Sequence, residues 1–161
     1  MITVEQLVDG FGLNLRLIHM QTDGLSHADS LVQTPHNINC LNWVLGHIAV
    51  NRDNVLRLIR GEPTLSNFAH QRYGTGSDPI KQDGEDVVNL EQLLELLDEG
   101  QARISEAAGM LSAEDMEKEI PVEDIKMPVI NRIFGFYFHD TYHTGQTDLL
   151  RQVAGMNDNV V

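Results

Sequence analysis

The sequence predicts an all-α fold, a four-helix bundle with a long crossover connection between the second and third helices. Apolar residues recur every three or four positions in four separate stretches, and no stretch shows the apolar-polar alternation that is typical of strands. The chain has 161 residues, of which 42% are hydrophobic, enough to bury one core without disulfide bonds. We therefore expect a single four-helix-bundle domain over residues 1–161.

The first helix is expected over roughly residues 4–22, because Thr3 and Gln6 form a capping-box pattern ahead of a helical apolar repeat. Its apolar positions are Val4, Leu7, Val8, Phe11, Leu15 and Ile18. A second helix follows a polar stretch that contains a proline, with Asn37 or Asn39 as its expected N-cap and Gly61 as its stop. Its apolar positions are Leu41, Val44, Leu45, Ile48, Val55, Leu56 and Ile59.

Residues 61–88 form the long connection, which is rich in glycine and proline and shows little periodicity. A connection of this length in a small domain is expected to cross the bundle, to cover a site, or both. His70 and Tyr73 within it are either lid residues over such a site or loop residues in solvent.

The third helix is expected to open at Asn89, with Gln92 at capping-box spacing, and to end near Met110. Its apolar stripe consists of Leu90, Leu93, Leu94, Leu97 and Ile104. One or two further helical turns are expected within residues 112–119.

The last helix is expected to begin with Pro128 in its first turn and to stop at Gly155, about 27 residues later. Its apolar positions are Ile133, Phe134, Tyr137, Leu149, Leu150 and Val153.

Charge and cysteine content exclude several classes of protein. The formal net charge of −13 makes phosphate backbones and anionic lipid surfaces unfavourable, so we expect neither nucleic acid nor membrane as a partner. Cys40 is the sole cysteine, which excludes an internal disulfide and fits a reducing cytosol. The N-terminus MITVEQLVDG lacks the basic and apolar regions of a signal peptide, and no apolar run reaches ~18 residues. We expect a cytoplasmic protein.

Three histidines are candidates for a metal site. His139 and His143 lie one helical turn, ~6 Å, apart on the last helix, so both imidazoles project from one face. By themselves they fit either a metal site or a solvated helix face. His47 lies in the apolar stretch LNWVLGHIAV, where it is either a third ligand or a core histidine with a hydrogen-bond partner. Cys40 is not a candidate ligand, because it precedes His47 by ~10 Å along the helix axis.

The segments NCLNWVLGHIAVNRDNVLRLIRG and FGFYFHDTYHTGQTDLLRQVAG resemble the two signature segments of the DinB/YfiT-like superfamily of small metalloenzymes. The resemblance covers the whole chain and is most specific at Leu45-Gly46-His47 and at the pattern His139-xxx-His143-xx-Gln146, which has Gly145 between its last two members. It implies a four-helix bundle with a three-histidine metal site formed by His47, His139 and His143. Three imidazoles leave one position open for water or substrate, and zinc and nickel both suit them.

Several residues near these histidines have alternative roles. Gln146 is expected either to orient a ligand or its water as a second-shell group, or to make a capping or interhelical contact. Asp140 is shorter than the glutamate of an HExxH protease, and is a second-shell acceptor or a solvated surface charge. Trp43 is expected either to line the metal pocket or to be an ordinary residue of the hydrophobic core. Arg132, seven residues before His139, is expected either to bind an anionic substrate or to have a surface or intrahelical role. No catalytic residue is identified from the sequence.

The resemblance implies a metal-dependent enzyme that transfers or uses a low-molecular-weight thiol such as bacillithiol or mycothiol. The alternatives are a metal-dependent hydrolase that activates water, or a non-catalytic metal-binding scaffold. The resemblance also implies a homodimer acting on a small-molecule substrate.

Overall fold

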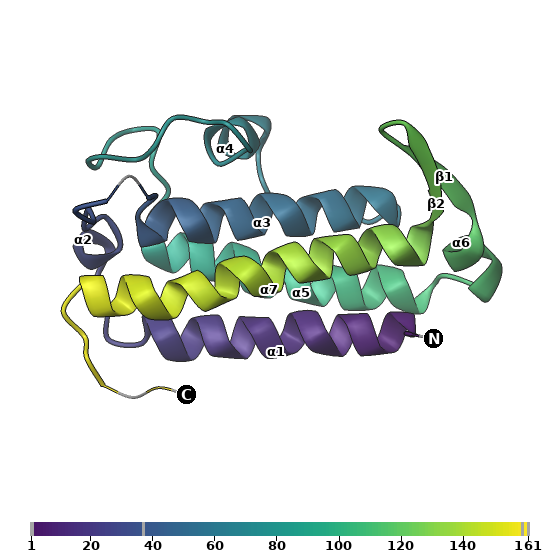
Figure 1. Cartoon of the computed structure of the whole chain (residues 1–161), viewed down its shortest axis with the longest axis horizontal. Helices are drawn as coiled ribbons and strands as arrows, with labels where there is room; N and C mark the ends of the chain where they lie inside the picture. The colour runs from purple at the N-terminus through teal and green to yellow at the C-terminus, as the bar shows by residue number, and fades with distance from the viewer. Residues whose placement is uncertain (1, 37, 159, 161) are drawn as a thin grey trace.

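Four long helices form the body of the computed structural model, which describes residues 2–36, 38–158 and 160. They are α1 (Val4–Thr22), α3 (Leu41–Leu58), α5 (Leu90–Gly109) and α7 (Val129–Val153). Helix α3 packs on α5 and α7, and α1 packs on the same two helices from the opposite corner. Because the connection from α3 to α5 returns along the bundle, these two helices run in the same direction (Figure 1). The predicted bundle with its long crossover is confirmed.

The helix starts show which local signals the chain uses. Both halves of the predicted capping box are formed at Thr3, and the side chain of Asn89 accepts a hydrogen bond from the backbone N–H of Glu91. The expected cap at Asn39 is wrong, because Cys40 occupies the N-cap position of α3 without a side-chain hydrogen bond. The alternative cap, Asn37, lies outside the described residues. Helix α7 has 25 residues and follows directly after Pro128.

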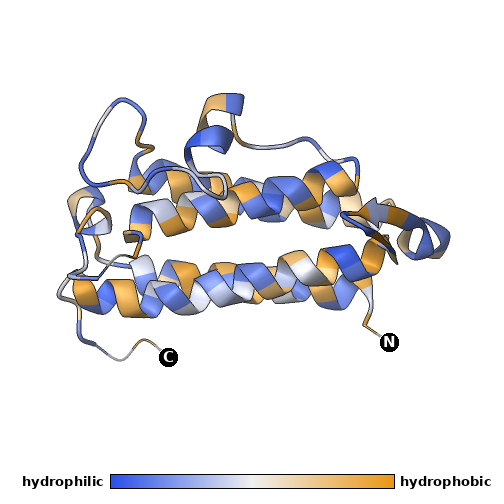
Figure 2. Ribbon diagram, turned by 45° about the horizontal axis from the view of Figure 1, so that its top comes forward, coloured by the Kyte–Doolittle hydropathy of each residue, from blue (hydrophilic) through white to orange (hydrophobic). Residues whose placement is uncertain are grey.

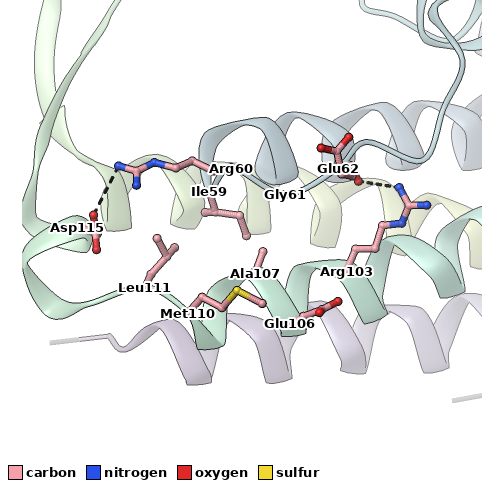
Figure 3. A pocket seen from close by; sticks show the side chains of 10 residues that line it. All are labelled: Ile59, Arg60, Gly61, Glu62, Arg103, Glu106, Ala107, Met110, Leu111 and Asp115. Atoms are coloured by element: carbon pink, nitrogen blue, oxygen red, sulfur yellow. Dashed lines mark hydrogen bonds and ion pairs between the residues drawn. The ribbon is translucent and has the colours of Figure 1, made fainter.

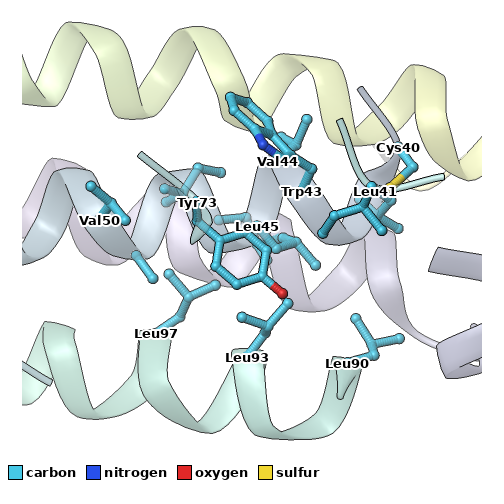
Figure 4. Close-up of a cluster of buried hydrophobic side chains, with 14 of the residues drawn as sticks. Cys40, Leu41, Trp43, Val44, Leu45, Val50, Tyr73, Leu90, Leu93 and Leu97 are labelled. Carbon is cyan, nitrogen blue, oxygen red and sulfur yellow. The ribbon is translucent and has the colours of Figure 1, made fainter. Parts of the chain in front are cut away.

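The core consists of two clusters of buried apolar side chains along the bundle axis. One of them joins α3 and α5 near the start of both helices, and Figure 4 shows Tyr73 lying between them, above Leu93. Cys40 belongs to this cluster and is buried, as expected. Apolar and polar residues interchange along every long helix, which is the pattern of amphipathic helices (Figure 2). Within the described part of the chain, no helix is both long enough and apolar enough to cross a membrane.

Short elements complete the fold. Helices α2 (His27–Ser30) and α4 (Asn67–Arg72) lie in the two connections that flank α3, and α6 (Ala113–Glu117) accounts for the turns expected within 112–119. Strands β1 (Glu119–Val122) and β2 (Ile125–Pro128) form an antiparallel hairpin, in which Val122 pairs with Ile125. The all-α prediction did not include this hairpin. Both strands have only four residues, so the alternation of exposed and half-buried residues in β1 is too short to indicate a strand from the sequence.

Candidate metal centre

The three predicted histidines come together at the interface between α3 and α7. One ring nitrogen from each of His47, His139 and His143 can be chosen so that all three lie within 4.8 Å of one another. The Nε2 atoms of His47 and His139 are 3.2 Å apart. His47 is buried, whereas His139 and His143 are half-buried and reach solvent. Residues 92 positions apart in sequence therefore share one small site.

Hydrogen bonds determine which nitrogen of two imidazoles faces the centre. Nδ1 of His47 lies 2.8 Å from the backbone carbonyl oxygen of Tyr73, and Nδ1 of His143 lies 2.7 Å from Oε1 of Gln146. An oxygen of a carbonyl or amide only accepts, so both Nδ1 atoms carry the hydrogen. Each Nε2 is left with a free lone pair. This is how a second-shell acceptor prepares a histidine for a metal ion.

Electrostatics keep the three imidazoles neutral. Burial, together with the neighbouring His143 and His47, lowers the pKa of His139 from 6.5 to about 4. Burial also lowers the pKa of His47 and of His143, although their bonds to Tyr73 and Gln146 oppose it. Three neutral nitrogen donors in one cluster fit a divalent cation such as zinc or nickel. Nδ1 of His139 is buried and has no partner among the described residues.

Tyr73 attaches the long connection to α3 through buried contacts. It is also the hydrogen-bond partner of His47 that the sequence did not indicate. Its side chain is fully buried, and its hydroxyl donates to Oδ1 of Asn42 and accepts from the backbone N–H of Val88. The ring lies against Gly46, where an added Cβ would stand 2.1 Å from a ring carbon. Tyr73 is thus neither a lid nor a solvent-exposed residue. Its contribution to the site is a backbone carbonyl, which no residue-type signal could have indicated.

His70 and Trp43 take different positions around the cluster. His70 lies outside it and bonds to Nη1 of Arg57. The Trp43 ring stacks on the His47 imidazole at 4.6 Å with a 16° interplanar angle, and its indole N–H donates to Oγ of Ser77. Trp43 is therefore both a core residue and a wall of the site.

Asp140 faces away from the imidazoles, into the bundle. It is fully buried and accepts hydrogen bonds from Nε of Arg52 at 2.9 Å and Nδ2 of Asn14 at 2.8 Å. Its interpretation as a solvated charge was wrong. No hydrogen bond joins it to His139 or His143 within the described ranges, so the expected second-shell role finds no contact to support it.

Two clefts open beside the histidines. One of about 280 Å³ is lined by His47 and His139 together with Asn54, Thr75 and Arg132. The other, of about 420 Å³, is more apolar. It is lined by Ile38, Asn39, Trp43, Val44, Tyr142, His143, Gln146, Leu149 and Leu150. Ligands can therefore approach the cluster from two sides.

A separate cleft of about 560 Å³ lies between the C-terminal ends of α3 and α5. Figure 3 shows its apolar floor, which includes Ile59, Ala107 and Met110, and the ion pair between Arg60 and Asp115 at its rim. None of the three histidines lines it, so it has no part in the chemistry of the cluster.

Comparison with known proteins gives a family and a fold. The family model of the DinB superfamily matches residues 18–147, a range that contains all three histidines. A crystal structure described as the conserved protein of locus from Enterococcus faecalis superposes with a TM-score of 0.74. The two chains are 14% identical, and the match covers 96% of this chain and 98% of that one, so the likeness concerns the fold. No curated protein matches the sequence.

Proposed function

Because the chain belongs to the DinB superfamily, we propose that it is a metal-dependent enzyme that activates a low-molecular-weight thiol for S-transfer. The observation that carries the proposal is the convergence of three neutral imidazoles, two of which have their Nε2 lone pairs fixed by acceptors at Nδ1. His47, His139 and His143 would hold the ion. When bound there, zinc or nickel supplies Lewis acidity that lowers the pKa of a coordinated thiol or water.

The surroundings of the cluster favour a thiol over water. Hydrolysis that starts from water generally uses a positioned base to take the proton. Among the described residues, no carboxylate makes an ion pair or hydrogen bond with the three imidazoles, and Asp140 is held by Arg52. A thiol, with its lower intrinsic pKa, needs no such base.

The chain's own side chains would hold the two substrates on either side. The apolar cleft formed by Trp43, Tyr142 and Leu149 suits the carbon skeleton of an electrophilic acceptor beside His143. The more polar cleft on the other side suits the thiol. Gln146 keeps the His143 ring oriented between them.

The test combines metal analysis with a thiol assay on protein purified without a histidine tag. We expect close to one ion per chain, loss of the ion in His47→Ala, and thiol consumption with an electrophilic acceptor only in metal-loaded protein. The matched control is His36→Ala, which removes an exposed histidine outside the cluster. Ester or amide cleavage without thiol would show the hydrolase instead. Metal binding with neither activity would show a non-catalytic scaffold.

We also propose that the chain forms a homodimer through α7. Phe134 and Phe138 lie four residues apart on α7, are 45% and 65% exposed, and form an apolar stripe outside the cleft assigned to the acceptor. A second copy would bury this stripe by two-fold pairing. Light scattering is expected to give a dimer for the native chain and a monomer for Phe138→Glu. Met110→Glu, which changes another exposed apolar residue, is expected to leave the dimer intact.

A further inference from the structure

Arg132, unlike five other arginines among the described residues, has no carboxylate partner. It lines the same cleft as His47 and His139, and its guanidinium lies over the Phe136 ring at 4.3 Å from the centroid. Arginines that pair with a carboxylate within the described residues are Arg52, Arg60, Arg72, Arg103 and Arg151. Among the described residues Arg132 makes no ion pair or hydrogen bond, although its side chain is half-buried. Its donors remain available to a ligand.

The position of Arg132 is unfavourable for the helix that carries it. It lies in the first turn of α7, where the positive end of the helix dipole disfavours a cation, and this turn contains no acidic residue to offset it. The chain has 24 acidic and 11 basic residues, so an unpaired cation is not explained by any shortage of carboxylates. The contact of its guanidinium with the Phe136 ring offsets part of this cost but uses none of its N–H donors. A cation that lacks a carboxylate partner at an unfavourable position is expected at a functional site.

We propose that Arg132 binds a carboxylate of the substrate, and that this contact selects small thiols with a carboxylate at the far end from the sulfur. The proposal rests on the proposed thiol chemistry and names its substrate class. Arg132 precedes His139 by seven residues, two turns on one face, so the carboxylate would lie roughly 10 Å from the metal ligands along the helix. The 280 Å³ cleft fits a small molecule of this length.

The residues beside Arg132 favour a carboxylate over a phosphate. The planar guanidinium matches a carboxylate with two parallel hydrogen bonds. Arg132 is the one basic side chain apart from the histidines among the residues that line this cleft, which is little positive charge for a phosphate dianion. Asn54 and Thr75 line the same cleft with amide and hydroxyl groups. The Oδ1 atom of Asn54 already accepts from Arg57, which leaves its NH₂ group for the ligand.

The first experiment needs neither metal nor thiol. Hexanoate, hexanol and butyl phosphate are titrated into metal-free, ¹⁵N-labelled protein, and the amide signals of Gly135 and Phe136 are followed. We expect hexanoate to bind about tenfold more tightly than hexanol. Arg132→Gln should abolish this preference, and Arg132→Lys should keep part of it. The matched control Arg16→Gln, an exposed arginine on α1, should keep all of it.

Equal binding of hexanoate and hexanol, or a preference that survives Arg132→Gln, would overturn the proposal. Tighter binding of butyl phosphate than of hexanoate would overturn the assignment to carboxylates.

The second experiment separates this inference from the proposed function. Co²⁺-loaded protein is titrated with 6-mercaptohexanoate and 6-mercaptohexanol, and the thiolate-to-cobalt absorption band is recorded. We expect both thiols to produce the band, with the carboxylate form about tenfold tighter in the native chain and equal to the alcohol in Arg132→Gln. A band of equal strength and affinity for both thiols in the native chain would leave the thiol chemistry standing and reject the role of Arg132. Absence of the band with either thiol would reject the thiol chemistry, while the hexanoate titration would still decide the anion site.

Discussion

Two polar groups lie at the same interface of α3 and α7, and consecutive residues of α7 belong to each of them. His139 belongs to the histidine cluster, whereas Asp140 belongs to a fully buried ion pair with Arg52. Nearly every polar atom of the ion pair has a partner within the chain. Asn14 donates a hydrogen bond to Asp140, and the Phe11 carbonyl accepts one from Arg52. In the histidine cluster three neutral rings point their nitrogens at one another.

The two groups differ in whether their polar atoms find partners within the chain. Arg52 and Asp140 neutralise each other, so removal of either partner would leave a charge stranded in the core. The histidines satisfy one another only in part, because the Nε2 atoms of His47 and His139 lie within hydrogen-bond distance of each other, whereas Nε2 of His143 has no hydrogen-bond partner among the described residues. The chain completes the first group by itself, whereas the second group keeps nitrogen donors that fit a metal ion.

The largest effect is expected from Asp140→Ala, which leaves Arg52 without a counter-ion. We expect a loss of about 3–5 kcal/mol in the free energy of unfolding, measured by chemical denaturation, with metal bound in proportion to the folded protein. The double variant Arg52→Met/Asp140→Leu removes both charges and should recover most of the stability. If Asp140→Ala were as stable as the native chain but unable to bind metal, the division between the two groups would be wrong.

Gly46→Ala tests whether the fold holds His47 in place through Tyr73. The added methyl would collide with the Tyr73 ring at 2.1 Å, so the connection must move away from α3. We expect a loss of about 1–3 kcal/mol in stability, together with weaker metal binding because the carbonyl partner of His47 moves.

Gly145→Ala provides the matched control within α7, because a Cβ there would meet nothing within 4 Å. It should raise stability by about 0.5–1 kcal/mol, since alanine favours a helix interior. A similar loss of stability in both variants would contradict a specific contact at Gly46.

Gln146→Leu changes the histidine cluster without touching the ion pair. Loss of the acceptor at Nδ1 of His143 is expected to weaken metal affinity about 10- to 100-fold, with little change in the unfolding free energy. Competition with a chromogenic chelator measures the affinity. Gln146→Glu retains an acceptor and should stay close to the native value, so equal losses in both variants would speak against the orienting role.

The smallest effect concerns the metal-free protein as pH falls. The unfolded chain takes up protons on histidine near pH 6.5, whereas folded His139 does so only near pH 4. More protons are then bound by the unfolded state between these values, so stability should be constant above pH 6.5 and fall as pH decreases toward 4. In thermal melting with a chelator, the melting temperature of His139→Gln should fall less between pH 6.5 and pH 4 than that of the native chain. Parallel curves for the two proteins would contradict the lowered pKa.

Most of the helical architecture could be predicted from local patterns. The bounds of α1 and α5 follow from Thr3, Asn89 and the apolar repeats behind them, because capping and burial act over a few neighbouring residues. The hairpin of β1 and β2 could not be predicted in the same way. Its two strands have only four residues each, and an alternation this short does not distinguish a strand from a loop.

For the site, the sequence by itself determined that His139 and His143 share a face of one helix, since a spacing of four residues dictates this. It also placed His47 in an apolar stretch, and the resemblance to a family suggested that the three meet. Only the tertiary structure decided that Asp140 turns inward to Arg52, that Tyr73 supplies a carbonyl to His47, and that Arg132 lines the cleft beside the cluster. The physical reason is that helical periodicity fixes directions within one helix, whereas the partner that a side chain meets depends on how separate helices and connections pack.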